Sequence, residues 1–357
     1  MPSYPSTLAE RRDARIASSL LALPPRALAR FAGKPIVIEG VPLNLEHAAI
    51  LRLMKMRGGA DVSTMTVDQA RARVRASTTS VAGTPLALAM IRDAAVAGAD
   101  GPLAARLYVP AEAAGPGLHP LLIFFHGGGW VVGSIDTHDA LCRHLAQASG
   151  ARVLSVAYRL APEHPYPAAA DDATAAFLDV ATSGERFGAD PARIAVGGDS
   201  AGANLAAVCT NDAVRAGGPR PAFQLLIYPA VDNVTQDRPS QQLFRSGFFL
   251  TVAAMAWYRS TYLGADEPRV APDPRSSPLF SPDLSAAAPA HIVTAGFDPL
   301  RDEGEAYAQR LREEGIPVTL RRHAGFIHGF ANMVGVGRSG RDAVIEMGGV
   351  LRRALGA

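Results

Sequence analysis

From residue 119 onward, short apolar runs alternate along the chain with segments of helical periodicity. Near-continuous apolar strands separated by helices are typical of a mainly parallel sheet covered on both faces. Two further strands are expected upstream, joined by the Gly-Ala-Asp-Gly turn at 98–101. The predicted strands are 88–95, 103–109, 121–125, 152–157, 193–197, 223–228, 291–296 and 317–322. The predicted helices lie near 137–149, 171–182, 201–216, 303–314 and 339–355.

Two regions depart from this alternation. Residues 1–83 carry amphipathic helical patterns and no strand pattern, whereas residues 232–290 are rich in proline, serine and aspartate and interrupt the sheet. A long insertion in a regular α/β chain is typically functional or disordered, and the aromatic residues of this one favour packing. The helical patterns lie near 7–22, 44–57, 66–76 and 251–263, and the aromatic residues that favour packing include Phe248, Phe249, Trp257 and Tyr258.

Composition narrows the class of protein. The 357 residues are 48% hydrophobic and 19% charged, as in an ordinary globular protein. The net charge of +2, with arginines scattered among acids, does not suggest a nucleic-acid or anionic-membrane partner. The first residues are charged where a secretory signal needs an apolar core, and no stretch approaches the roughly 20 apolar residues of a membrane span. Cys142 and Cys209 lie in helical patterns, which favours free thiols and a cytoplasmic location over a disulfide between them.

A candidate nucleophile follows the predicted strand 193–197. Residues 198–202 read Gly-Asp-Ser-Ala-Gly, which matches the nucleophile-elbow pattern G-x-S-x-G. The strand directly before and the helix directly after provide the setting that this pattern needs, with Ser200 as the nucleophile. The amide of Ala201 would then point toward an oxyanion at the helix N-terminus. The alternative is a glycine-rich turn with a helix-capping serine.

A second glycine-rich turn follows the predicted strand 121–125. Residues 126–130 read His-Gly-Gly-Gly-Trp, and consecutive glycines let backbone amides approach a substrate closely. Hydrolases build part of the oxyanion hole from such a loop after an early strand. The alternative is a flexible or phosphate-binding turn, although neither G-x-G-x-x-G nor G-K-[ST] is present. We expect His126 to orient the loop rather than act as a base.

The base must be a histidine that follows Ser200 in the chain. Three are available: His291 should be buried in a strand, His323 ends a strand, and His328 lies in the loop after it. Loops that follow strands carry the catalytic groups of open α/β sheets, so His328 is preferred over His323.

The acid should orient the histidine and stabilise its charged form. Asp298 directly follows the predicted strand 291–296. Asp232 is the rival, and its simpler role is that of a turn residue. Asp302 and Glu303 begin the next helix and are expected to interact with its dipole.

Taken together, these segments resemble the bacterial hormone-sensitive-lipase family of esterases, also called family IV of the α/β hydrolases. The resemblance implies a triad of Ser200, Asp298 and His328 without metal or organic cofactor. It also implies an oxyanion hole made by the amides of Gly128, Gly129 and Ala201, with Gly127 shaping the loop. The segments that carry it are HGGGW at 126–130, YRLAPEH at 158–164, GDSAG at 198–202, DPLRD at 298–302 and HGF at 328–330.

The family fold implies a catalytic domain from 84–231 and 291–357 and a helical cap from 1–83 and 232–290. The first forty or so residues exceed the usual family start. They could extend the cap, cover an acyl pocket or contribute to a homodimer contact. The segment 158–163 is expected to support the site rather than take part in the reaction.

The function expected from this resemblance is hydrolysis of small carboxylic esters with short- to medium-chain acyl groups. The polar, proline-rich segment 264–290 does not suggest the exposed apolar lid of a long-chain lipase. A long-chain lipase, an amidase or peptidase with the same triad, and a non-enzymatic ligand receptor on this fold remain the alternatives.

Overall fold

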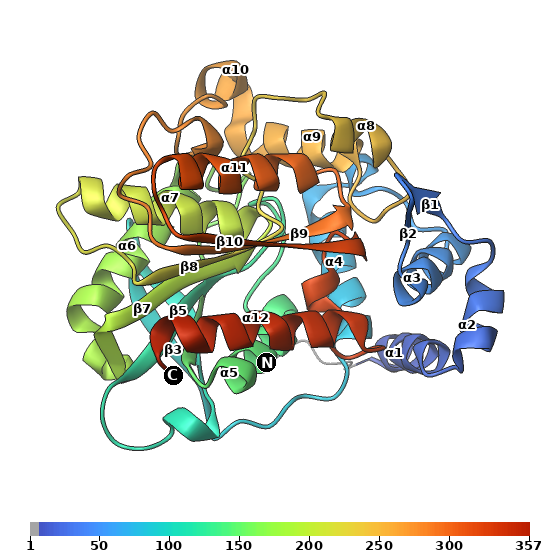
Figure 1. The fold of residues 1–357 in the computed structure, drawn as a ribbon, viewed down its shortest axis with the longest axis horizontal. Helices are drawn as coiled ribbons and strands as arrows, with labels where there is room; N and C mark the ends of the chain where they lie inside the picture. Colours follow the sequence, from blue (N-terminus) through green and yellow to red (C-terminus); the bar gives the residue numbers. More distant parts are fainter. Residues whose placement is uncertain (1–6) are drawn as a thin grey trace.

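An eight-stranded sheet forms the centre of the protein, whose computed structural model describes residues 7–357. The strand order is β10-β9-β8-β7-β5-β6-β4-β3, and the strands are parallel except for the antiparallel additions of β4 and β3 at one edge (Figure 1). This is the α/β-hydrolase fold that the sequence predicted. The strands are β3 (Met90–Gly98), β4 (Gly101–Val109), β5 (His119–Phe125), β6 (Arg152–Val156), β7 (Ala189–Asp199), β8 (Phe223–Ile227), β9 (Ala290–Phe297) and β10 (Val318–Ile327).

Helices bury both faces of this sheet. Along β5, the side chains of Leu121, Ile123 and Phe125 pack toward one set of helices, whereas Leu122 and Phe124 pack toward the other. Burying such side chains contributes about 1.5–3 kcal/mol each, which is why this strand is a continuous apolar run. The first face is covered by α6 (Ala168–Ser183), α7 (Ala201–Arg215) and α11 (Arg301–Glu313), and the second by α5 (Asp139–Ser149) and α12 (Ser339–Leu355).

The N-terminal region contains more structure than the sequence predicted. Three helices lie where helical patterns were found, but α2 was missed because its eight residues are too short to establish a period. The expectation of no strand was wrong, because two-residue strands β1 and β2 pair around Glu39 and Gly40, both with positive φ as in a tight hairpin turn. The elements are α1 (Leu8–Leu21), α2 (Pro25–Ala32), β1 (Val37–Ile38), β2 (Val41–Pro42), α3 (Leu45–Met56) and α4 (Val67–Val81).

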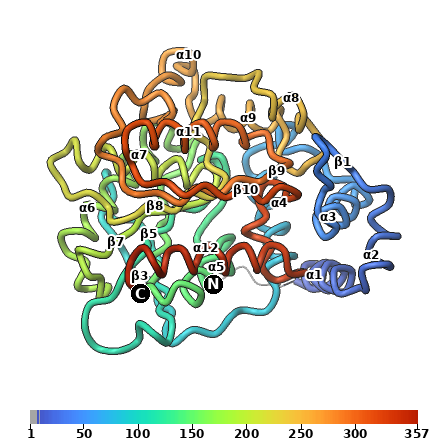
Figure 2. The backbone as a smooth tube through the Cα atoms, viewed as in Figure 1, coloured from blue at the N-terminus to red at the C-terminus, as the bar shows by residue number. Residues whose placement is uncertain are grey.

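The insertion between β8 and β9 is ordered and lies beside the N-terminal helices. Its α9 contacts the short helix Val62–Thr64, which connects α3 to α4. Both regions lie beyond the carboxyl ends of β9 and β10, where the blue and gold segments of the chain meet (Figure 2). The helices of the insertion are α8 (Pro239–Leu243), α9 (Val252–Leu263) and α10 (Glu267–Val270).

Two further expectations concern single features of the chain. Cys142 and Cys209 are both buried and free, so the disulfide alternative is wrong. Across residues 7–357, no helix is long and apolar enough to cross a membrane.

Candidate active site

Ser200 occupies the sharp turn between β7 and α7. Its backbone adopts φ +55°, a region that residues with a side chain rarely occupy. Gly198 and Gly202 make the turn sterically feasible: a Cβ on Gly198 would lie 2.4 Å from the carbonyl oxygen of Phe125, and one on Gly202 would lie 1.9 Å from it. The turn therefore presents the Ser200 side chain at the carboxyl edge of the sheet, half-buried, with the first amides of α7 behind it.

Three side chains from separate loops form a hydrogen-bonded chain at this edge. His328 Nε2 lies 3.1 Å from Ser200 Oγ, and His328 Nδ1 lies 2.7 Å from Asp298 Oδ2. The Asp298 carboxylate is fully buried, and its other oxygen accepts a hydrogen bond from the amide of Leu300 at 2.9 Å. Because β7, β9 and β10 are parallel, the loops that follow them meet at one edge. The arrangement suits nucleophilic attack by a serine assisted by a histidine.

The rival residues have other partners. His323 lies within β10 and stacks on Phe326 at 4.9 Å between ring centroids, and His291 is buried in β9 beside Thr319. Asp232 bonds to the guanidinium of Arg238, with 2.9 Å between Oδ2 and Nε, and caps the turn that follows β8. None of the three reaches Ser200.

The loop after β5 lies next to Ser200. Gly128 and Gly129 have φ of +122° and +58°, and a Cβ would lie 2.2 Å from the carbonyl oxygen of Val132 or 2.3 Å from the Tyr258 ring. Only glycine fits at either position. Their amides, and that of Ala201, have no hydrogen-bond partner among the described residues. Free amides at this edge are the donors that an oxyanion hole requires.

Two side chains hold this loop in place. His126 is buried, its Nδ1 lies 2.9 Å from the carbonyl oxygen of Gly127, and its own carbonyl accepts a hydrogen bond from the Tyr158 hydroxyl at 2.6 Å. Burial lowers the pKa of His126 to about 3, so its ring is neutral at ordinary pH. Trp130 stacks on Tyr262 with ring centroids 4.5 Å apart.

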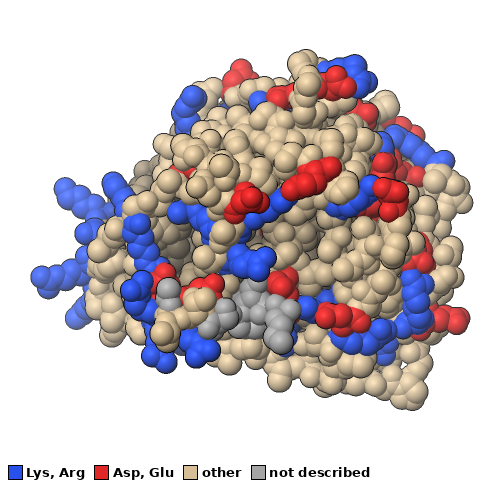
Figure 3. All heavy atoms as spheres, turned by 180° about the vertical axis from the view of Figure 1, so that it is seen from behind, with Lys and Arg blue, Asp and Glu red and all other residues tan. Residues whose placement is uncertain are grey.

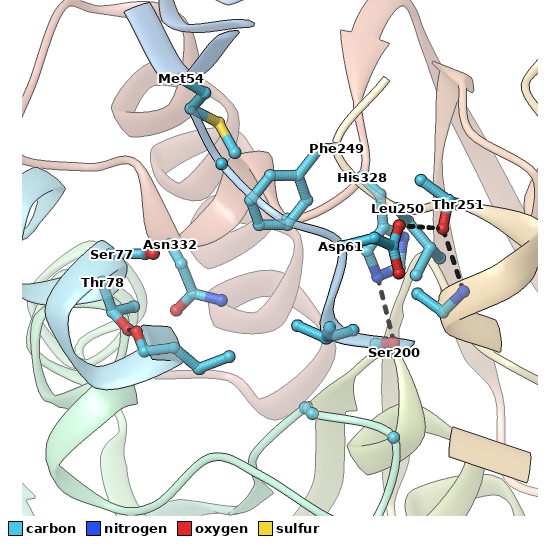
Figure 4. Close-up of a pocket in the computed structure, with 18 of the residues that line it drawn as sticks. Met54, Asp61, Ser77, Thr78, Ser200, Phe249, Leu250, Thr251, His328 and Asn332 are labelled. Atoms are coloured by element: carbon cyan, nitrogen blue, oxygen red, sulfur yellow. Dashed lines mark hydrogen bonds between the residues drawn. The ribbon is translucent and has the colours of Figure 1, made fainter. Parts of the chain in front are cut away.

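A cavity of about 1270 Å³ leads from Ser200 and His328 to the N-terminal helices. Figure 4 looks into it, with Ser200 and His328 on one side of the view and Ser77 and Thr78 of α4 on the other. Of the four aromatic residues singled out in the insertion, Phe249 and Tyr258 line this cavity. Phe248 packs against Phe244 and Phe297, and Trp257 packs against Tyr258. The aromatic residues therefore divide between cavity wall and core.

The cavity wall joins the two regions that the sequence assigned to a cap. The Thr251 hydroxyl, at the start of α9, donates a hydrogen bond of 2.6 Å to the Asp61 carboxylate. Burial acts to raise the pKa of Asp61, but this hydrogen bond and the amide of Ser63 hold it below its ordinary value. The cavity also reaches Ala17 of α1.

Within residues 7–357, no group of three or more histidine, cysteine, aspartate or glutamate side chains could hold a metal ion. A family model described as alpha/beta hydrolase fold matches residues 122–332, which is more than half of the chain.

The chain belongs to the α/β-hydrolase family. The predicted hormone-sensitive-lipase-like branch is confirmed, and the protein is a carboxylic ester hydrolase. It is 43% identical over 333 residues to the carboxylic ester hydrolase LipN of Mycobacterium tuberculosis, with 91% of this chain and 86% of LipN covered. It is 37% identical over 297 residues to an ethyl acetate hydrolase of Pseudomonas putida, with 82% and 92% covered.

Solved structures agree with these relatives. An ester hydrolase from the metagenome of Lake Arreo, determined with a derivative of bipyridine phosphonate, superposes with a TM-score of 0.83. The match has 41% sequence identity and covers 90% of this chain and all of the other. A thermostable esterase from Pseudomonas putida superposes with a TM-score of 0.81 at 33% identity, with 88% of this chain and 98% of the other covered.

This α/β hydrolase has a buried carboxylate beside Ser200 for which sequence reasoning gave no role. Asp199 accepts a hydrogen bond from the amide of Gly127 at 2.8 Å, and its Oδ1 lies 3.1 Å from His138 Nε2. Its other oxygen accepts hydrogen bonds from Tyr228 and Asn332. Burial acts to raise the pKa of Asp199, but His138 and the amide of Gly127 keep it below its ordinary value. Its place directly before Ser200 was the one available clue.

Arg71 of α4 is a second residue that the sequence did not reveal. Its guanidinium binds both oxygens of Glu163 at 2.7 Å, and it also donates to the carbonyl oxygens of Val131 (3.0 Å) and Ala161 (3.1 Å). One side chain therefore ties α4 to the glycine loop and to the segment 158–163. No local pattern marks such a contact.

Glu303 lies in the first turn of α11, as expected, but its side chain makes contacts that the sequence did not predict. Its side chain is fully buried, and Oε1 accepts hydrogen bonds from the amides of Val231 (2.8 Å) and Asp232 (3.2 Å). Burial raises the pKa of Glu303 well above its ordinary value, which favours the neutral acid. Asp302, whose pKa is lowered by Arg301 and Ser240 against the opposing effect of burial, is the charged partner of the helix dipole.

Proposed function

We propose that this enzyme hydrolyses short- to medium-chain acyl esters through a triad of Ser200, His328 and Asp298. The observation that carries the proposal is the chain of two hydrogen bonds, 3.1 and 2.7 Å long, that links Ser200 to His328 and His328 to Asp298 at the end of a large cavity. We further propose that residues 84–231 and 291–357 form the catalytic domain, and that 1–83 and 232–290 form the cap.

In the proposed cycle, His328 Nε2 accepts the proton of Ser200 as Oγ attacks the ester carbonyl carbon. The amides of Gly128, Gly129 and Ala201 would stabilise the resulting oxyanion, and Asp298 would stabilise the imidazolium. When the carbon–oxygen bond of the ester breaks, His328 gives its proton to the leaving alcohol. A water molecule, deprotonated by the same histidine, then attacks the acyl-serine and releases the acid.

The acyl range is argued from the surface of the insertion. A long-chain lipase would need an exposed apolar lid. Within residues 264–290, Phe280 is the only large apolar residue whose side chain is exposed. A series of nitrophenyl esters from acetate to laurate tests this. We expect kcat/KM to be greatest between acetate and octanoate, and a maximum at decanoate or longer would overturn the acyl assignment.

The nucleophile is tested with Ser200→Ala. We expect kcat to fall by at least about 10³-fold, because the residual rate would come from the oxyanion hole and binding alone. Ser77→Ala is the matched control, since Ser77 lines the same cavity on α4, and it should retain activity within about twofold. Full activity of the Ser200 variant, or a phosphonate adduct on a different serine in the mass spectrum, would overturn the assignment.

A further inference from the structure

Charge is distributed unevenly along this chain. Residues 7–57 contain nine of the 35 lysines and arginines but four of the 33 acidic residues, so this segment has a net charge of +5 in a chain of net charge +2. The remainder of the chain is therefore net negative. The expectation that the arginines are scattered among acids was wrong for this segment, which forms α1, α2, α3 and the β1–β2 hairpin.

The cations of this segment are exposed, whereas its acids take part in ion pairs or hydrogen bonds. Asp13 lies 3.5 Å from Arg12 and 3.4 Å from Arg57. Glu39 pairs with Arg301 at 2.7 Å, and Glu46 accepts hydrogen bonds from the amides of Arg338 and Ser339. All nine cations are exposed. Lysine and arginine side chains gather at the left of the view in Figure 3, with few acidic side chains among them. The nine cations are Arg11, Arg12, Arg15, Arg26, Arg30, Lys34, Arg52, Lys55 and Arg57.

Large apolar side chains are exposed on the same elements. Of the thirteen large apolar residues that are exposed among those described, six belong to this segment, with Leu8 86% exposed and Met56 67% exposed. We call these six residues and the nine cations the α1–α3 face. The six are Leu8, Ile16, Leu23, Ile36, Val37 and Met56.

Helix α1 shows the pattern in its simplest form. Leu8, Arg12, Arg15 and Ile16 are spaced i, i+4, i+7 and i+8, which places them on one face of the helix. The opposite face carries buried residues such as Leu21. Apolar and cationic side chains together on an outward helix face are typical of a helix that lies in the interface of a membrane.

The entrance of the active-site cavity opens within this face. Ile36 and Met56 are exposed and also line the cavity that leads to Ser200, and the exposed cations Arg52 and Lys55 do the same. A surface that covered the α1–α3 face would therefore lie against the cavity entrance.

We propose that the α1–α3 face docks this esterase onto an anionic lipid bilayer, with the cavity entrance turned toward the lipid. Cations near an anionic bilayer gain electrostatic attraction, and exposed apolar side chains gain burial between the headgroups. A nucleic acid would satisfy the cations but would not bury Leu8 or Met56. A second copy of the chain that docked through the same face would bring two segments of net charge +5 together, which would repel. The docking does not depend on the proposed triad.

Vesicle binding tests the proposal directly. The full-length enzyme and its Ser200→Ala variant are sedimented with vesicles of equal phosphatidylglycerol and phosphatidylcholine, or of phosphatidylcholine alone, at low and high salt. We expect both proteins to bind the anionic vesicles at least about tenfold more tightly than the neutral ones, with the difference lost at high salt. Equal binding to both vesicles, or binding to neither, would overturn the proposal whatever the activity of the enzyme.

A charge-matched pair of variants locates the docking surface. Arg15, Arg26 and Arg30 changed together to Gln should weaken binding to anionic vesicles by about a hundredfold. The control changes three exposed arginines outside the face to Gln, so the net charge falls equally, and it should bind within about threefold of wild type. The control residues are Arg220, Arg312 and Arg353. Equal losses of vesicle affinity in the two variants would show that binding depends on net charge alone. That result would overturn the assignment of the α1–α3 face as the docking surface.

The apolar residues distinguish a bilayer from a polyanion. Leu8→Ser combined with Ile16→Ser should weaken vesicle binding by about tenfold while leaving binding to heparin unchanged. Vesicle binding that is insensitive to this change would mean a polyanion site and would overturn the bilayer assignment. Neither residue lines the cavity, so hydrolysis of a soluble nitrophenyl ester should be unchanged and would show that each variant is folded.

Discussion

At the scale of single residues, the site depends on how closely backbone segments approach one another. Ser200 keeps a positive φ that costs a residue with a side chain about 1–3 kcal/mol. The turn is possible because Gly198 and Gly202 have no side chains, so the backbones of β7 and α7 can lie in contact with the carbonyl oxygen of Phe125. The same closeness fixes Ser200 relative to the glycine loop, since Phe125 directly precedes that loop.

Gly202→Ala should therefore damage both stability and activity. The added Cβ would meet a backbone oxygen at 1.9 Å, and we expect a loss of about 3 kcal/mol in the free energy of unfolding and at least about a hundredfold in kcat. Gly349→Ala in α12 is the control, because its nearest neighbour is 3.9 Å away and alanine should stabilise the helix by about 0.5–1 kcal/mol. Urea unfolding and ester hydrolysis measure both. A Gly202 variant as stable and active as wild type would contradict this account.

At the scale of elements, α3 supports the loop that carries His328. His47 of α3 is buried, accepts a hydrogen bond of 3.3 Å from the amide of Ile327, and packs edge-on against Phe326. The amide of Asn44, which begins the same helix, donates to the carbonyl oxygen of Gly325 at 2.8 Å. A helix from the N-terminal region thus fixes the end of β10, directly before the proposed base.

This contact should make the enzyme sensitive to acid. Burial lowers the pKa of His47 from 6.5 to about 3, so its stabilising contribution is complete above pH 6.5 and is lost as the pH falls from there toward 3. Between pH 7.5 and 5, wild type should lose about 2 kcal/mol more unfolding free energy than His47→Asn, whose side chain does not titrate. His126 acts in the same direction in both proteins, so it cancels. Urea midpoints at the two pH values measure the difference, and parallel losses would refute it.

At the scale of the whole molecule, the sequence predicted most of the sheet because each buried strand is a local apolar run. The contacts that it did not reveal join distant segments, as Arg71 does with Glu163 and Asp199 with His138. The net charge of the whole chain was similarly uninformative about the α1–α3 face, because the charge of +5 in residues 7–57 is offset by the net negative charge of the rest. The raised pKa of Glu303 follows from burial, which no position in a helix pattern predicts.

The sequence left three roles open for the first forty residues. Helix α1 packs on α4, and Ala17 of α1 is buried and lines the cavity. These contacts favour the role of covering an acyl pocket. They also place α1 beside α4, whose Ser77 and Thr78 line the same cavity.

Removing residues 1–22 should therefore change acyl selectivity more than chemistry. Loss of the α1 wall would remove apolar contact from a longer acyl chain, so we expect kcat/KM for a nitrophenyl octanoate to fall about fivefold relative to the acetate, whose kcat should stay within about twofold. Because a truncated chain can fold poorly, Ala17→Phe provides the complementary test. Its ring would enter the cavity and lower the octanoate-to-acetate ratio by steric exclusion, with stability checked by urea unfolding. A ratio unchanged in both variants would mean that α1 does not bound the acyl pocket, and that its cavity-facing residues serve packing alone.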